Sequence, residues 1–224
     1  MKWNAAATFL GSRTNKAADA WLRDVLDKID AQSPAITAFE HAWWAAGRTL
    51  GQTRLAPTPD EETALAVSPA GFCGDEYGRT LLLLAVLAGQ PPSTHLGLVD
   101  DLFSTGELRE QQAVLRALPY LPGPERFVPI AIEAVRTNAI SVIEAIACEN
   151  PYPTRYFPDA ALNQLVLKCL FCGVSLQRML DLPPRITPEL KRMVAGYASE
   201  RRAAGRTVPE DTNLILEGDA HAPV

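Results

Sequence analysis

Apolar residues recur along this chain at helical spacing, and most of the segments that carry them begin and end at helix-capping residues. One buried helix face is outlined by the i, i+3, i+4, i+7, i+8 pattern of Leu190, Met193, Val194, Tyr197 and Ala198. Another helix begins at Thr58-Pro59-Asp60-Glu61, where a threonine cap precedes a proline, and a glutamate follows three residues after the cap. Alternating β-branched runs with hairpin turns are absent from the sequence. The pattern predicts an all-α protein.

The capping residues divide the chain into a series of predicted helices. Their bounds are Lys16–Asp30, Pro34–Gly47, Pro59–Val67, Asp75–Ala88, Thr94–Phe103, Glu107–Leu118, Pro124–Arg136, Ile140–Glu149, Pro158–Cys172 and Pro188–Ala204. Short connections between them favour antiparallel neighbours that stack as hairpins. From Glu107 to Glu149 three helices follow one another at the spacing of a HEAT-like repeat. We therefore expect either a HEAT-like helical repeat (an α-solenoid) or a compact stack of antiparallel helix pairs.

The same pattern predicts one all-helical domain over residues 1–206. Residues 1–15 form either a first helix or a loosely held arm. Beyond Gly205 the chain becomes polar and carries too few apolar side chains to pack firmly. We expect residues 207–224 to be a mobile tail.

Composition and charge exclude several classes of protein. Across 224 residues the net charge is −5, which argues against a nucleic-acid-binding protein, because such proteins need a basic surplus. The most apolar run, Leu81 to Leu87, is too short to cross a bilayer, so no membrane insertion is expected. The first residues lack the apolar core and cleavage site of a signal peptide. These features favour a cytoplasmic protein.

The four cysteines are expected to be reduced thiols in that compartment. Cys169-x-x-Cys172 lies inside a predicted helix among apolar residues, unlike a redox motif at a helix N-terminus. Cys73 and Cys148 do not complete a zinc-ligand pattern with them or with the histidines. No glycine-rich phosphate loop, G-x-S-x-G or H-E-x-x-H motif is present. The sequence therefore predicts no metal, no cofactor and no catalytic residue.

The segment NPYPTRYF, beginning at Asn150, combines prolines with aromatic residues. Its prolines predict a stiff corner without hydrogen bonds. Tyr152, Tyr156 and Phe157 present aromatic surface, and Arg155 can stack on a ring or pair with a carboxylate. Two interpretations stay open. The rings either fill a gap between helix pairs or line the mouth of a site for a flat or aromatic ligand.

The helix after this corner is apolar nearly all round, which predicts that it lies inside the protein. Gln164 and Lys168 are exceptions on one edge, four residues apart. Lys168 either extends to solvent or binds an anion. Asn163 either satisfies the neighbouring loop or contributes a polar group to a small-molecule pocket. We expect Asn163 to tie the corner to the helix, so that Asn163→Leu costs about 1–3 kcal/mol.

The stretch from about Arg136 to Arg206 resembles the EboA family. The motifs that carry the resemblance are N-P-Y-P, Y-F, N-Q-x-V-L-K-x-L-F and Y-A-x-E-R-x-A-A-G-R. The residues of this chain that match the family pattern are Asn138, Glu144, Asn150, Tyr152, Tyr156, Asn163, Gln164, Lys168 and Arg201. The link Leu182-Pro183-Pro184-Arg185 departs from the polar, arginine-rich link of the family.

The resemblance implies a cytoplasmic protein of the ebo gene cluster, which is linked to moving secondary-metabolite precursors, some of them aromatic, toward the periplasm. It brings no established reaction. We expect a helical protein that binds a small metabolite or other ebo-cluster proteins. The expected ligand-binding residues are Glu144, Asn150, Tyr152, Arg155, Tyr156, Asn163, Gln164, Lys168 and Arg201. The alternatives are an enzyme that uses Glu144 or Lys168 as acid or base, and a scaffold for partner proteins.

Overall fold

The computed structural model describes residues 3–31 and 36–217, and within them the chain forms helices and no strand. The all-α prediction is confirmed. The expected helix start at Ser33-Pro34 and the end of the expected tail, residues 218–224, lie outside the described residues. The chain divides into two compact units, and the boundary along the sequence lies between Phe127 and Val128. That boundary divides the segment predicted as one helix from Pro124 to Arg136.

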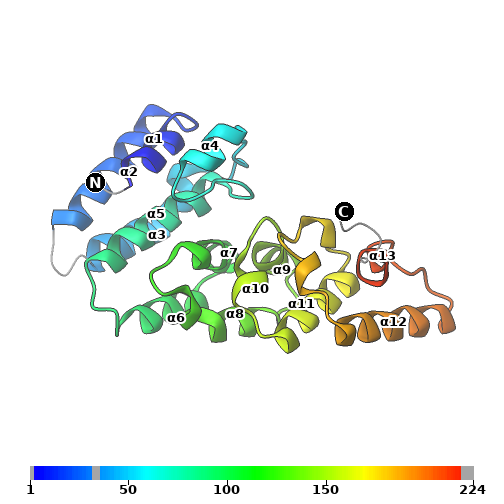
Figure 1. Cartoon of the computed structure of the whole chain (residues 1–224). Helices are drawn as coiled ribbons and strands as arrows, with labels where there is room; N and C mark the ends of the chain where they lie inside the picture. The colour runs from blue at the N-terminus through cyan, green and yellow to red at the C-terminus, as the bar shows by residue number, and fades with distance from the viewer. Residues whose placement is uncertain (1–2, 32–35, 218–224) are drawn as a thin grey trace. The chain divides into compact units, whose positions relative to one another are not determined.

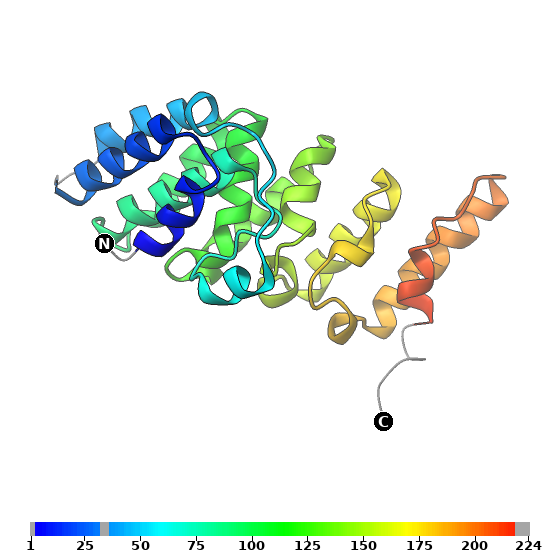
Figure 2. The ribbon, with the colours of Figure 1, turned by 90° about the horizontal axis from the view of Figure 1, so that it is seen from above.

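The first unit is built around helix α5 (Gly74–Ala88), which contacts α1, α2, α3 and α7 and is buried along most of its length. The other helices of this unit are α1 (Asn4–Gly11), α2 (Lys16–Ala31), α3 (Ile36–Leu50), α4 (Pro59–Ala64), α6 (His95–Thr105), α7 (Leu108–Ala117), η1 (Leu118–Tyr120) and η2 (Pro124–Phe127). Figure 1 labels the α-helices, and Figure 2 shows α2 and α3 side by side. The leucines of α5 and the four helices that contact it together account for its burial.

Glycine allows α3 and α5 to approach closely. A Cβ atom at Gly74 would lie 2.9 Å from the Leu50 carbonyl oxygen and 3.2 Å from that of Gly51, so a larger residue would push the start of α5 away from the backbone at the end of α3. The start of α5 is capped by Glu76, whose carboxylate accepts a hydrogen bond of 2.8 Å from the backbone N–H of Cys73. The sequence therefore fixes both the beginning of α5 and its distance from α3.

Charged side chains are buried at the first turns of α5. Arg79 donates to Asp75 at 2.8 Å and to Glu110 of α7 at 2.7 Å. Arg109 contacts both Asp75 and Glu76, the latter at 3.2 Å. Asp75 is 0% and Arg79 1% exposed. A buried charge needs such partners, because desolvation alone would be unfavourable. The sequence analysis missed this cluster.

The second unit places α9 among the other helices, with contacts to α8, α10 and α11, while α12 packs against α11 and α13. Its helices are α8 (Val128–Ala134), α9 (Ile140–Ala147), α10 (Tyr152–Tyr156), α11 (Asp159–Cys172), η3 (Leu176–Arg178), η4 (Pro183–Arg185), α12 (Pro188–Ala203) and α13 (Thr212–Leu216). Helix α13 lies in the predicted tail, where Thr212 and Ile215 are buried.

The corner predicted to lack hydrogen bonds is instead the short helix α10. Phe157 N–H donates to the Pro153 carbonyl at 3.0 Å, and Arg155 N–H donates to the Pro151 carbonyl at 3.2 Å. The prediction was wrong because proline is compatible with the first turn of a helix, whose N–H groups have no helical partner. Asn150 supplies the missing acceptor, since its side-chain oxygen accepts from Tyr152 N–H at 3.0 Å.

Helix α11 is not enclosed on all sides, contrary to the sequence-based expectation. Leu162, Leu165 and Val166 are buried, but Phe171 is 70% exposed. Leu167, on the same side as Phe171, is only partly buried. The hydrophobic content of a helix does not decide how many neighbours cover it, and here one apolar face remains open to solvent.

Candidate functional site

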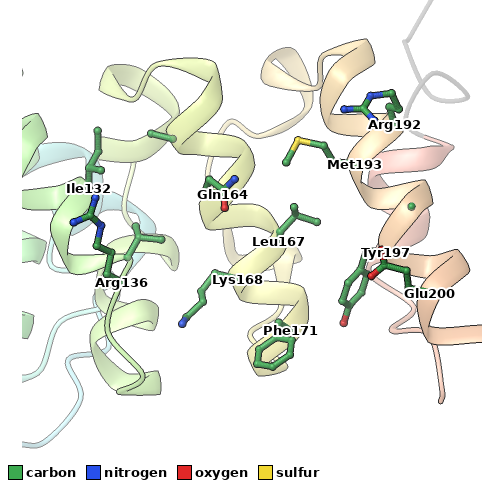
Figure 3. A pocket seen from close by; sticks show the side chains of 13 residues that line it. Ile132, Arg136, Gln164, Leu167, Lys168, Phe171, Arg192, Met193, Tyr197 and Glu200 are labelled. Carbon is green, nitrogen blue, oxygen red and sulfur yellow. The ribbon is translucent and has the colours of Figure 1, made fainter. Parts of the chain in front are cut away.

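The open face of α11 forms the floor of a groove in the second unit. Helices α8 and α12 and the residues after α8 supply its walls, and its volume is about 840 Å³. Figure 3 shows side chains from these three helices around the groove. Its apolar lining consists of Ile132, Val135, Ala161, Leu167, Phe171, Met193, Gly196 and Tyr197. An open groove with exposed aromatic surface is a place where a ligand can remove apolar area from water.

The polar side chains of the groove are mostly cationic. They are Arg136, Gln164, Lys168, Arg192 and Glu200, with three positive charges against one negative charge. Arg136 pairs with Glu133 at 2.9 Å, and Arg192 pairs with Glu189 at 2.7 Å, so carboxylates outside the groove lining balance both arginines. Hydrogen bonds from Arg192 lower the pKa of the Glu189 carboxyl.

Lys168 differs from those arginines because its contact is neutral. Its Nζ donates to Asn138 Oδ1 at 3.3 Å. Figure 3 shows Lys168 extending toward the side of the groove where Arg136 lies. Within the described residues, the side chains of Gln164 and Glu200 have no hydrogen-bond partner. These groups can therefore bind an acidic or polar ligand without first breaking an ion pair.

Tyr197 joins the two helices on one side of the groove. Its hydroxyl donates to the Leu170 carbonyl at 3.1 Å, which links α12 to α11. Arg201 lies behind it, with its guanidinium carbon 5.7 Å from the Tyr197 ring centroid. Arg201 also donates to the Thr207 carbonyl at 2.6 Å and does not line the groove. Arg201 therefore contacts a residue of the groove wall without lining the groove itself.

Two arginines hold the segments before and after α11. Arg185 donates to the carbonyls of Thr154 and Phe157, the latter at 2.8 Å, and pairs with Asp159 at 2.9 Å. Because these three acceptors precede or begin α11, Arg185 fixes the N-terminal end of the groove floor.

Arg178, which lies in η3 after α11, holds the segment that follows the helix in place. It binds both carboxylate oxygens of Glu149 at 2.8 Å and Glu144 at 2.7 Å. The hydrogen bonds that Arg178 donates to these carboxylates, foremost to Glu149, raise the pKa of Arg178 even though burial opposes the charged form. Glu149 has a positive φ of 49° and its N–H donates to the Arg178 carbonyl at 2.9 Å. The paired contacts hold this unusual backbone in place.

Of the expected ligand-binding residues, Gln164 and Lys168 lie together on the groove. Glu144 is held by Arg178 and is not part of the groove lining. Asn150 is buried, donates to the Ala145 carbonyl at 2.9 Å and accepts from Tyr152 N–H, so its contacts are structural.

The aromatic corner also lies apart from the groove lining. Tyr152 is 0% exposed and packs against Tyr156 at a ring-centroid distance of 4.9 Å. Phe157 packs edge-on against Tyr152 at 6.3 Å. Arg155 is exposed, 4.0 Å from Asp181. Among these rings, Tyr152 and Phe157 are buried and Tyr156 is partly exposed.

Asn163 does not form the bond that was expected of it. Its side chain is 4% exposed, and its Oδ1 has no hydrogen-bond partner. The residue lines a smaller cavity of about 580 Å³ that shares Gln164 and Met193 with the groove. The corner is instead joined to α11 through Arg185.

The sequence did not indicate that Arg136, Phe171 and Glu200 line the groove. It assigned Met193 and Tyr197 to a fully buried helix face. In the structure Leu190, Val194 and Ala198 form that face, whereas Met193 and Tyr197 are partly exposed on the groove. A signal was present in the sequence: Leu167 and Phe171 are four residues apart, opposite the more continuous apolar face of the helix.

None of the four cysteines lines the groove. The four cysteines are free thiols, and burial raises the pKa of the Cys169 thiol, which leaves it protonated and unreactive. In the part of the chain that is described, no group of three or more histidine, cysteine, aspartate or glutamate side chains is placed to hold a metal ion. Along the same residues, every helix is too short or too polar to cross a membrane.

Family comparison extends the resemblance found in the motifs. The family described as metabolite traffic protein EboA matches residues 4–216, which include both compact units. No match is found among curated proteins or among solved structures. Because the family match covers most of the chain, the protein belongs to the EboA family of metabolite traffic proteins.

Proposed function

We propose that this protein serves metabolite traffic by binding a small molecule in the groove between α8, α11 and α12. The observation that carries the proposal is the coexistence of exposed apolar surface and available polar groups in one groove. Phe171 is 70% exposed, and the side chains of Gln164 and Glu200 have no partner within the described residues. The exposed ring lets a ligand cover apolar surface, while the unpartnered polar groups can hydrogen-bond to it.

The lining favours a flat or aromatic molecule that carries an acidic group. Phe171 and Tyr197 offer ring surface, and an aromatic ligand gains about 0.5–1.5 kcal/mol from each well-placed ring pair beyond the area that it buries. Lys168, with a neutral partner, is the cation best placed to meet the acid. The adjoining cavity at Asn163 gives room for a larger ligand to extend.

Binding and release describe the role better than catalysis. An acid–base enzyme needs titratable groups that face the same reacting atoms. Glu144, one of the two candidates for that role, is engaged by Arg178 and does not line the groove. An open groove suits a protein that takes up a metabolite in the cytoplasm and hands it on toward the periplasm.

The helical arrangement of the second unit also supports contacts with other proteins of the ebo cluster. Contacts link α8 with α9, α9 with α11, α11 with α12 and α12 with α13, so near neighbours in sequence pack together. We infer that these helices stack as HEAT-like repeats. Such stacks present extended surfaces on which a partner could receive the ligand.

A fluorescent aromatic sulfonate, anilinonaphthalene sulfonate, is a suitable first probe because it combines flat rings with an acid. Phe171→Ala and Lys168→Met are each expected to weaken its binding about tenfold, equivalent to about 1.4 kcal/mol. Both side chains are at least partly exposed, so the urea midpoint should hardly change. Lys16→Met, at an exposed position in the first unit, is the matched control.

Native mass spectrometry of the same variants, after incubation with cell extract, then identifies the natural ligand. The proposal predicts that the unchanged protein and Lys16→Met retain the same small molecule and that the two groove variants lose it. If all four proteins bind the probe and the extract components equally, the groove is not the binding site.

A further inference from the structure

A second pocket, of about 510 Å³, lies in the first unit. It is formed by the C-terminal part of α3, the first turns of α5 and α7, and the residue at the end of α6. Its lining is dominated by charged and polar side chains, in contrast to the apolar groove of the second unit. The pocket therefore needs its own explanation.

The floor of this pocket is the buried charged cluster at the start of α5. Asp75, Arg79 and Glu110 all line the pocket and are 0%, 1% and 8% exposed. Arg79 also donates through Nε to the Trp43 carbonyl at 3.0 Å. With its bonds to Asp75 and Glu110, this guanidinium uses three of its five N–H donors. Two donors remain for another acceptor.

A glycine keeps space open beside those donors. A Cβ atom at Gly47 would lie 3.3 Å from Arg79 Nη2 and 3.9 Å from Nη1. Gly47 lies inside α3, where glycine is unfavourable relative to alanine by about 0.5–1 kcal/mol. The glycine therefore weakens the helix and leaves a space the size of a methyl group beside the buried guanidinium, which lines the pocket.

Two unpaired charges of opposite sign stand at the rim. Arg48 of α3 and Glu107, the cap of α7, both line the pocket and are exposed. Within the described residues, neither side chain has an ion-pair or hydrogen-bond partner, and they do not pair with each other. The rim also carries Trp44, which is 46% exposed.

The charges of the pocket balance. Three guanidinium groups and three carboxylates line it: those of Arg48, Arg79 and Arg109, and those of Asp75, Glu107 and Glu110. Asp75 and Glu110 are already paired with arginines, which leaves Arg48 and Glu107 as the unpaired charges of the lining in the described part of the chain. A simple anion would be repelled by Glu107, and a simple cation by Arg48. A small molecule with one charge of each sign avoids both penalties.

We propose that this pocket is a second binding site, for a small zwitterion of the α-amino-acid type. The ligand carboxylate binds Arg48 and the open N–H edge of Arg79, and the ligand ammonium binds Glu107. Trp44 covers the ligand side chain. The site lies wholly within the first unit and does not depend on the proposed role of the groove.

Gly47→Ala is the most direct test, because it fills the space beside Arg79 without removing a charge. The added methyl group occupies the space beside Arg79 and is expected to weaken binding at least about tenfold. Because that methyl group also lies 3.3 Å from a guanidinium held by three hydrogen bonds, the urea midpoint of the variant is measured together with its binding. Gly97→Ala on α6 is the matched control, since a Cβ atom there meets nothing within 4 Å.

Binding is measured by isothermal titration calorimetry with the common L-α-amino acids, their N-acetyl forms and their amides. At least one free amino acid is expected to bind the unchanged protein and Gly97→Ala. Loss of either ligand charge, or Arg48→Gln or Glu107→Gln, should weaken that binding about tenfold or more.

Three results would overturn the proposal. They are the absence of binding by any free amino acid at concentrations on the order of 10 mM, equal binding of a blocked form, and unchanged binding to Gly47→Ala. Both rim residues are exposed, so a folding defect does not confuse their variants.

Discussion

Arg79→Ala removes the central cation of the buried cluster in the first unit. The side chain is 1% exposed and joins Asp75, Glu110 and the Trp43 carbonyl. After the substitution Asp75 still contacts Arg109, whereas Glu110 loses its guanidinium partner. The variant thus leaves the largely buried Glu110 carboxylate and the Trp43 carbonyl without the hydrogen bonds that Arg79 had donated to them.

The expected loss of unfolding free energy is about 3–5 kcal/mol, the usual effect of removing one partner of a buried ion pair. The unpaired Trp43 carbonyl falls within the same range, since an orphaned buried acceptor costs about 1–3 kcal/mol. Replacing both Arg79 and Glu110 by methionine should recover part of the loss, because no unpaired carboxylate then remains at position 110. The double variant is therefore expected to be more stable than Arg79→Met alone.

Urea unfolding followed by tryptophan fluorescence isolates this effect. All four tryptophans of the chain, Trp3, Trp21, Trp43 and Trp44, belong to the first unit, so the signal reports on that unit alone. Arg192→Ala, which breaks an exposed ion pair in the second unit, is the control and should leave the fluorescence transition unchanged. A loss below about 1 kcal/mol for Arg79→Ala would refute the assignment of a buried, partner-dependent charge cluster.

Two other predictions concern buried groups of the second unit. Asn150→Leu is expected to lower the free energy of unfolding by about 1–3 kcal/mol, because Asn150 forms hydrogen bonds with Ala145 and Tyr152. Asn163→Leu should leave the protein at least as stable, because the Oδ1 atom of Asn163 has no hydrogen-bond partner among the described residues. Urea midpoints in the opposite order would contradict this. Burial raises the pKa of the Cys169 thiol above its ordinary value of 9.0. Above pH 9 the thiol therefore ionises in the unfolded chain but not in the folded protein, so the stability that the buried thiol contributes below pH 9 is progressively lost. Urea midpoints at about pH 8 and about pH 9.5 should fall less for Cys169→Ala than for the unchanged protein, and an equal fall would show that this thiol does not contribute.

The long helices were predictable because their ends carry local signals. Thr58 and Thr187 cap helices through their side chains in the structure as in the sequence pattern, and Gly173 ends α11 in a left-handed conformation. Helices α10 and α13 were missed because each has only five residues, too few for a periodic pattern. Their existence depends on tertiary contacts, such as the bond from Asn150 to Tyr152 N–H.

The candidate site was predictable only along one helix. The edge with Gln164 and Lys168 follows from helical spacing, and both residues line the groove. Its opposite walls come from residues about thirty positions away on α8 and α12, and no local pattern relates them to α11. The buried charged cluster of the first unit was unpredictable for the same reason, because it joins residues that are distant in sequence. Asp75 and Arg79 look like an ordinary surface pair in sequence, and only Glu110, 31 residues after Arg79, and the covering helices make that pair buried.

The two arginines that hold the ends of α11 have a consequence for the speed and strength of binding. Because Arg185 and Arg178 fix the segments on either side of this helix, the floor of the groove is already ordered before any ligand arrives. Ordering a flexible segment on binding would subtract from affinity, and a rigid floor avoids that entropic loss. A small ligand can then bind through a few contacts, while the open groove of the protein still permits fast release. The metabolite-binding role proposed above needs that combination, because a ligand that is held too tightly is not released.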